Sequence, residues 1–137
     1  MPAGNLIYEI KNLRHAYNGR PVLDIESFTV ERNSIVGLMG PNGSGKSTLL
    51  RFMGFIETPA EGEVRYNGKT EHPFSDAVKS HVTMLPQTPY LMKRSVWKNI
   101  AYGLTLDKRI PKPEVKDRVC ETPTMVGPDA DTFARRQ

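Results

Sequence analysis

The sequence predicts an α/β domain, and three observations support this fold class. Residues 34–39 are short and apolar, as in a buried strand, and they lead into a glycine-rich stretch at residues 40–48. The residues that follow are typical of a helix that stops at Gly54. Two more strand-like segments precede this unit, and Asn18-Gly19 between them is a strong hairpin signal. We therefore expect an antiparallel β region, then a strand–loop–helix unit.

The composition limits the classes of protein to consider. The 137 residues are the length of one domain, and a 38% share of hydrophobic residues is enough to bury a core. The net charge of +4 is modest and no Lys/Arg run occurs, so nucleic-acid binding is not expected. Cys120 is the single cysteine, which excludes an intrachain disulfide and favours a reducing compartment. With no signal-peptide pattern and no apolar stretch near the ~20 residues of a membrane span, we expect a cytoplasmic protein.

The first region, residues 6–33, is expected to be antiparallel β structure. Residues 6–13 alternate in part like a half-buried strand, and Tyr17 follows before the turn. Residues 21–30 make a second strand region. Nucleoside kinases and small GTPases usually open with the loop strand itself, so this antiparallel pair argues against them. The absence of an Asn-Lys-x-Asp motif argues further against a GTPase.

The second region, residues 34–90, contains the glycine-rich loop, which fits the phosphate-binding pattern G-x-x-x-x-G-K-[ST]. Glycines allow positive φ, so successive backbone N–H groups can point inward at anionic oxygens. The following helix adds the positive end of its dipole. Lys46 supplies a mobile charge for the outer phosphates, Ser47 a hydroxyl for Mg²⁺, and Thr48 lies close to the innermost phosphate. The predicted phosphate-binding residues are Gly40, Asn42, Gly43, Ser44, Gly45, Lys46, Ser47 and Thr48.

Two strands and a short helix are expected between the loop helix and residue 90. A strand at residues 63–66 leads into a tight turn at Asn67-Gly68. Residues 75–80 are expected to form a short helix capped by Ser75. Residues 81–85 are expected to form a strand, buried by its composition, that ends at Pro86-Gln87.

The third region, residues 91–137, is predicted to be helical. Ser95 is expected to cap a helix over residues 96–102, with Gly103 as its stop. A last helix begins near Pro113 and has Val115, Val119 and Thr122 on one face. Pro123 lies inside it and indicates either a shortened helix or a sequence under little constraint.

Tyr17, the loop and Gln87 together resemble the ATP-binding subunit of an ABC transporter, and the resemblance runs through residues 6–137. It implies one partial P-loop NTPase (ABC ATPase-like) domain over residues 1–137, with an N-terminal antiparallel β subdomain and the start of a helical subdomain. It implies ATP and Mg²⁺ as cofactors. Tyr17 would stack on adenine, and Gln87 would join Ser47 at Mg²⁺ as the Q-loop glutamine. A tyrosine before a turn is by itself usually an ordinary strand-end residue, and the place of Tyr17 relative to the loop is what favours the stacking role.

The resemblance also implies partners. These are transmembrane permease subunits and a second ATP-binding subunit in a head-to-tail dimer, which would place the protein on the inner face of the plasma membrane. Trp97 is as consistent with a helical core as with a permease contact. Residues 89–96 look most like importers of small oxyanions such as tungstate.

The family's pattern has further motifs that this sequence does not contain. No Leu-Ser-Gly-Gly-Gln-like signature, no apolar strand ending in Asp-Glu and no switch histidine occurs, so no catalytic residue is predicted. We expect the N-terminal half of such a subunit, which binds ATP without useful hydrolysis, has an open sheet edge and is prone to self-associate. The alternatives are a non-catalytic fragment of a split or decayed gene, and an ABC-type ATPase that acts on DNA repair or ribosomes.

Overall fold

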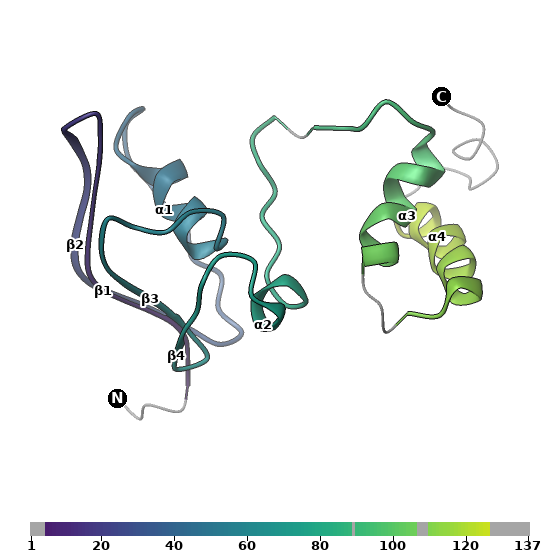
Figure 1. The fold of residues 1–137 in the computed structure, drawn as a ribbon, viewed down its shortest axis with the longest axis horizontal. Coiled ribbons are helices and arrows are strands. Elements are labelled where there is room, and N and C mark those ends of the chain that lie inside the picture. Colours follow the sequence, from purple (N-terminus) through teal and green to yellow (C-terminus); the bar gives the residue numbers. More distant parts are fainter. Residues whose placement is uncertain (1–4, 89, 107–109, 127–137) are drawn as a thin grey trace. The chain divides into compact units, whose positions relative to one another are not determined.

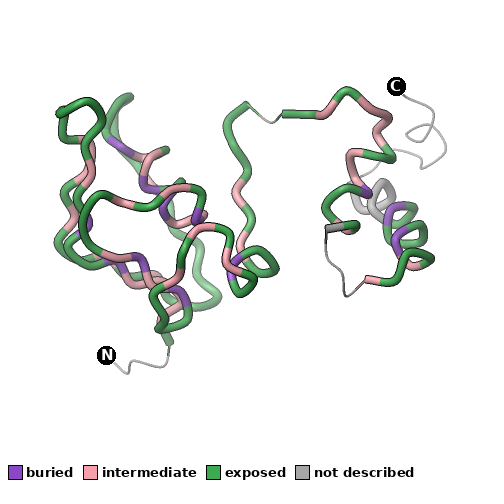
Figure 2. The backbone as a smooth tube through the Cα atoms, in the orientation of Figure 1, coloured by how far each residue is buried: buried purple, intermediate pink, exposed green. Residues whose placement is uncertain are grey.

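The computed structural model describes residues 5–88, 90–106 and 110–126, and the chain divides into two compact units, Met1–Leu85 and Pro86–Gln137 (Figure 1). Each unit has its own cluster of buried apolar side chains. In Figure 2 these buried residues follow the sheet and the first long helix of one unit, and the paired helices of the other.

The first unit contains a four-stranded antiparallel sheet of order β2-β1-β3-β4. Its strands are β1 (Leu6–Tyr17), β2 (Arg20–Glu31), β3 (Glu61–Tyr66) and β4 (Lys69–Thr70). Both predicted hairpins are confirmed. Asn18 and Gly19 have φ of 50° and 77°, and Asn67 and Gly68 have 52° and 76°. Positive φ at both central residues is the condition for the tight turn that suits twisted strands.

A bulge in β1 brings two core residues to the same face of the sheet. Ile10 and Leu13 are both fully buried, although residues three apart on a regular strand point to opposite faces. The pairing of β1 with β3 shifts register between Lys11 and Arg14, and Asn12 has a φ of 49°. This extra residue rotates the strand, so both apolar side chains face the core.

Helix α1 (Lys46–Met53) packs on this sheet (Figure 1). Leu49 and Phe52 lie one turn apart on its buried face, and Phe52 is fully buried. The helix ends at Gly54 as predicted, where the Gly54 N–H donates to the carbonyl of Leu50 at 2.7 Å. The buried cluster of this unit comprises Ile10, Leu13, Leu49, Phe52, Phe55, Val64, Tyr66 and Val78.

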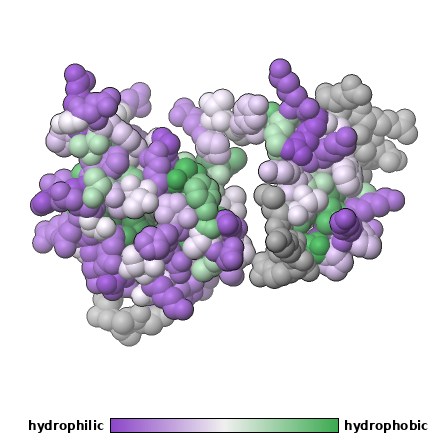
Figure 3. Space-filling model, viewed as in Figure 1, coloured by the Kyte–Doolittle hydropathy of each residue, from purple (hydrophilic) through white to green (hydrophobic). Residues whose placement is uncertain are grey.

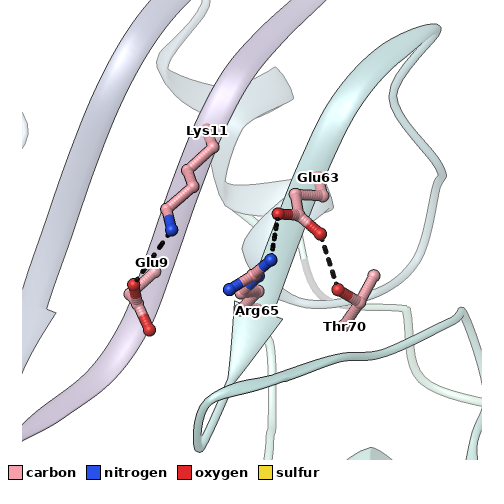
Figure 4. A network of polar contacts seen from close by, with 5 residues as sticks. All are labelled: Glu9, Lys11, Glu63, Arg65 and Thr70. Carbon is pink, nitrogen blue, oxygen red and sulfur yellow. Dashed lines mark hydrogen bonds and ion pairs between the residues drawn. The ribbon is translucent and has the colours of Figure 1, made fainter. Parts of the chain in front are cut away.

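Polar contacts link charged side chains of the sheet (Figure 4): Lys11 pairs with Glu9 within β1, Arg65 pairs with Glu63 within β3, and Thr70 of β4 binds Glu63. Lys11 is opposite Glu63 on β3, where the Glu63 carboxylate accepts from Thr70 Oγ1 at 2.6 Å and pairs with Arg65 at 2.7 Å. The Thr70 hydrogen bond first, and Arg65 second, hold the pKa of Glu63 below its usual range. Opposite charges across a strand pair favour one register, although exposed pairs add little to stability.

Two strands predicted from composition are absent. Residues 34–39 and 82–85 lie outside any helix or strand, and Ile35, Met39 and Leu85 are 102%, 95% and 83% exposed. The prediction of a buried strand at residues 81–85 is therefore wrong here. A strand is stabilised by ladder hydrogen bonds to a neighbour, and no strand of the described part of the chain pairs with either segment. Figure 3 shows hydrophilic side chains over most of the visible surface of the first unit, with patches of hydrophobic residues between them.

The short helix α2 (Asp76–Lys79) forms where it was expected, but its predicted cap does not. The Ser75 hydroxyl donates to the Glu71 carboxylate at 2.8 Å instead of accepting from the helix. Val78 is buried and packs α2 into the buried cluster of the first unit.

The second unit pairs α3 (Val96–Leu106) with α4 (Lys112–Val126). Ala101, Val115 and Val119 are buried between them, with Leu104 packed against this cluster. The predicted stop at Gly103 is wrong, since α3 continues to Leu106: the packing of the partly buried Leu104 offsets the ~1 kcal/mol cost of a glycine within a helix. Helix α4 also continues through Pro123, so the helix is not shortened there.

The Tyr8 hydroxyl joins β1 to the end of α1 by donating to the Met53 carbonyl at 3.1 Å. Burial, with a smaller contribution from Tyr66, raises the pKa of Tyr8 to about 12. The unfolded chain releases this proton near pH 10, so the stabilisation is complete below that pH and is lost between pH 10 and 12. We expect the free energy of unfolding to fall more steeply over this interval in the wild type than in Tyr8→Phe. Urea titrations at a series of pH values would check this, and parallel curves would contradict it.

Candidate functional site

The glycine-rich loop adopts a backbone that only glycine accommodates easily. Gly40, Gly43 and Gly45 have φ of 153°, 83° and 85°. A Cβ on Gly45 would lie 2.8 Å from the carbonyl oxygen of Val22, and one on Gly40 would lie 2.8 Å from Ser44 Oγ. Glycines at these positions let the loop turn tightly and approach β2.

The loop ends at the N-terminus of α1, which the protein leaves uncapped. Gly45 is the N-cap residue, no side chain caps the helix, and its first turn holds no acidic residue. The first intrahelical bond joins the Leu49 N–H to the Gly45 carbonyl at 2.8 Å. The N–H groups of residues 46–48, in the first turn of α1, and the positive end of the helix dipole are therefore available to an anion.

Lys46 folds back over the loop. Its Nζ donates to the carbonyl oxygens of Gly40 at 2.8 Å and Pro41 at 2.7 Å, and it lies 3.4 Å from Ser44 Oγ. The ammonium group is thus held at the mouth of the loop by acceptors that a phosphate oxygen could replace.

The loop is open to ligands and to a hard cation. It borders a hollow of about 460 Å³ on the β2 side, lined by Leu23, Met39 and Lys46 among others. Ser47 is exposed in the first turn of α1, so its hydroxyl oxygen is free to meet a metal. Among the described residues no cluster of three His, Cys, Asp or Glu side chains could hold a metal. The donor set suits Mg²⁺, which is commonly bound by few protein oxygens together with phosphates.

Tyr17 lies at the end of β1, close to the first turn of α1. Its side chain is 40% exposed, and its hydroxyl donates to Glu57 Oε2 at 2.8 Å. This hydrogen bond raises the pKa of Tyr17, and the neighbouring Thr48 hydroxyl acts in the opposite direction. The structure thus brings Tyr17 into the same region as the loop helix, with part of its ring open to solvent.

The predicted site residues fall in both units. The loop residues and Tyr17 lie in the first unit, whereas Gln87 lies in the second. A metal site shared by Ser47 and Gln87 therefore stays a prediction. Sequence reasoning missed Glu57 and Arg51 as neighbours of Tyr17, because Glu57 lies 40 positions away and carries no motif.

The antiparallel sheet, the loop and the uncapped helix define the class of this protein: an α/β domain with a phosphate-binding-type loop. The family model described as "ABC transporter" matches residues 23–134. The chain therefore belongs to the ABC transporter family, as the resemblance of Tyr17, the loop and Gln87 indicated.

Individual relatives agree with this assignment. The chain is 44% identical to the tungstate uptake system ATP-binding protein TupC of Peptoclostridium acidaminophilum. The 112 aligned residues cover 82% of this chain and 50% of that relative. It is 34% identical to the spermidine/putrescine import ATP-binding protein PotA of Clostridium novyi (strain NT), over 82% of this chain and 32% of the relative. The chain thus spans half or less of the length of these relatives.

A solved structure supports the fold. The ATP-binding cassette MJ0796, in a dimeric post-hydrolysis state bound to ADP and Pi, superposes with a TM-score of 0.77 at 23% identity. The match covers 96% of this chain and 61% of that one. The ABC ATPase fold with an N-terminal antiparallel β subdomain is thereby confirmed. Within the described residues, no helix is both long and apolar enough to cross a membrane.

Proposed function

We propose that this chain binds ATP with Mg²⁺ as the nucleotide-binding part of an ABC transporter. One observation carries the proposal: an uncapped helix N-terminus behind three positive-φ glycines, with the Lys46 ammonium held at its mouth. Each feature favours an anion, and together they match the demands of a polyphosphate.

The residues divide the work of binding. The backbone N–H groups of Gly43 and of residues 45–48 hold phosphate oxygens, and Lys46 neutralises the outer phosphates. Ser47 and Gln87 hold Mg²⁺, which when bound offsets the negative charge of the phosphates. Tyr17 stacks on the adenine ring through the exposed part of its side chain.

The wider role follows from the relatives. We propose import of a small solute, and an oxyanion such as tungstate is favoured because the TupC relative shares 44% identity. Polyamine import is the second candidate, supported by the PotA relative at 34%. The chain would act at the inner face of the plasma membrane, with a second ATP-binding subunit and with permease subunits. Exposed Tyr90, Leu91 and Trp97 supply an apolar surface for the permease, and Trp97 lies outside the buried cluster of its unit.

Binding and hydrolysis are separate parts of this proposal. The sequence contains no Asp-Glu pair after an apolar strand, so none of its residues is assigned as a catalytic base. We assign ATP hydrolysis to the complete transporter. The alternative to a transport role is that this chain is a non-catalytic fragment of a split or decayed gene. A steady-state assay of phosphate release tests the absence of a catalytic base, because appreciable turnover by this chain would contradict that assignment.

Lys46→Ala tests the nucleotide site directly. Removing the ammonium group is expected to weaken binding of a fluorescent ATP analogue at least about tenfold, since a charged hydrogen bond contributes about 1.5–3 kcal/mol. Fluorescence anisotropy with Mg²⁺ measures the affinity, and circular dichroism verifies the fold. Lys69→Ala is the matched control, because Lys69 is an exposed lysine on β4 and should leave the affinity unchanged. Equal affinities of the Lys46 variant and the wild type would overturn the proposed function.

A further inference from the structure

The Glu57 carboxylate bridges two side chains that no motif connects. Its Oε2 accepts from the Tyr17 hydroxyl at 2.8 Å, and its Oε1 pairs with the Arg51 guanidinium at 2.5 Å. Arg51 belongs to the last turn of α1, and Tyr17 closes β1. One carboxylate therefore ties the end of the first strand to the helix that follows the phosphate-binding loop.

The ring of Tyr17 has a second contact. The His15 ring meets it edge-on, with centroids 4.5 Å apart and planes at 76°. His15 in turn lies 5.0 Å from the ring of Phe52, which is fully buried. Both ring nitrogens of His15 are buried without a hydrogen-bond partner among the described residues, so His15 forms a wall beside Tyr17 through ring packing alone.

This arrangement limits the freedom of an otherwise exposed aromatic ring. An unrestrained tyrosine beside a hairpin turn would populate several rotamers and lose that freedom when it stacks on a ligand. Contacts of the hydroxyl with Glu57 and of the ring with His15 reduce that cost beforehand. The 40% of the side chain that stays exposed remains available for a flat base.

We propose that Glu57, held by Arg51, is a positioning residue that orients Tyr17 for stacking on the purine base of the nucleotide. This inference rests on the proposed function, since it requires a nucleotide in the loop. Glu57 acts on the base only and leaves the phosphate contacts to the loop. A purely structural role for the Arg51–Glu57 pair would instead affect base and phosphates alike, because it would displace α1 and its N-terminus.

Two ligands separate these roles: ATP, which carries a base, and inorganic tripolyphosphate, which does not. Calorimetric titration of the full chain with Mg²⁺ and each ligand gives the two affinities. Glu57→Ala is expected to weaken ATP binding about three- to tenfold, the range of one hydrogen bond, and tripolyphosphate binding by less than about twofold. Glu57→Gln keeps a carbonyl oxygen for the Tyr17 hydroxyl and should restore most of the ATP affinity.

Tyr17→Phe completes a double-mutant cycle, because phenylalanine retains the ring and lacks the hydroxyl. It should weaken ATP binding about as much as Glu57→Ala, and the double variant should lose no more than either single variant. Additive losses, equal losses for ATP and tripolyphosphate, or unchanged ATP affinity in Glu57→Ala would each overturn the positioning role. Lys46→Ala is carried in parallel: if it leaves both ligands bound as in the wild type, the proposed function itself fails.

Discussion

Gly62→Ala is expected to disrupt the sheet and cost at least about 3 kcal/mol of stability, because it combines a left-handed backbone with a clash against main-chain atoms. Gly62 has a φ of +83°, and a Cβ there would lie 2.3 Å from the Asn12 oxygen and 2.5 Å from the Lys11 oxygen. Both oxygens belong to the bulged part of β1, so neither can retreat without loss of the bulge. Ile10 and Leu13 would then no longer share the core face.

Gly68→Ala is the matched control for this prediction. Gly68 also has a positive φ, +76°, but nothing lies within 4 Å of a Cβ built on it. The control variant should lose only the backbone contribution, about 1 kcal/mol. Urea titrations followed by the amide resonances of Ile10 and Val64 report on the first unit alone, whereas Trp97 fluorescence would report on the second. Similar losses in the two variants would refute the clash with β1.

The local part of the fold was predictable from the sequence. Asn18-Gly19 and Asn67-Gly68 each determine a two-residue turn by their own backbone preferences, whatever surrounds them. The end of α1 at Gly54 depends on the adjacent residues in the same way. The bulge at Asn12 was missed, although the spacing of Ile10 and Leu13 breaks the alternation of a regular strand and could have indicated it.

Features that depend on distant residues were not predictable. Residues 34–39 have the composition of a strand, but a strand exists only beside a partner, and Ile35 is instead fully exposed. Gly103 has the sequence signature of a helix stop, yet α3 continues past it and the partly buried Leu104 packs against the cluster that joins α3 to α4. In both cases tertiary pairing, or its absence, decides the outcome.

In the candidate site, too, the residues that are contiguous in sequence were predictable and those brought together by folding were not. The loop from Gly40 to Thr48 is continuous in sequence, so its pattern predicts its glycines and its lysine together. Tyr17 was found through its place relative to that loop. The partners of Tyr17, Glu57 and His15, are joined to it only by folding, because β1 must lie beside the segment that follows α1.

Phe52→Ala is expected to destabilise the first unit by about 3–5 kcal/mol, the range for removing a buried phenylalanine from a core. The Phe52 side chain is fully buried, and it belongs to the cluster that joins α1 to the sheet. Its ring also supports His15, 5.0 Å away. The cavity left by the alanine would remove contacts from α1 and from the wall behind Tyr17 together.

Leu50→Ala on the same helix provides the comparison, because Leu50 is 46% exposed and alanine is a good helix former. We expect it to cost less than about 1 kcal/mol, and equal losses in the two variants would contradict the assigned core. The same pair also tests how the site depends on the fold. Helix α1 carries the loop at its N-terminus and Arg51 near its C-terminus. Loss of its packing in Phe52→Ala should therefore weaken the binding of both tripolyphosphate and ATP. That common loss would distinguish Phe52→Ala from Glu57→Ala, for which only the base-dependent part of the affinity is expected to change.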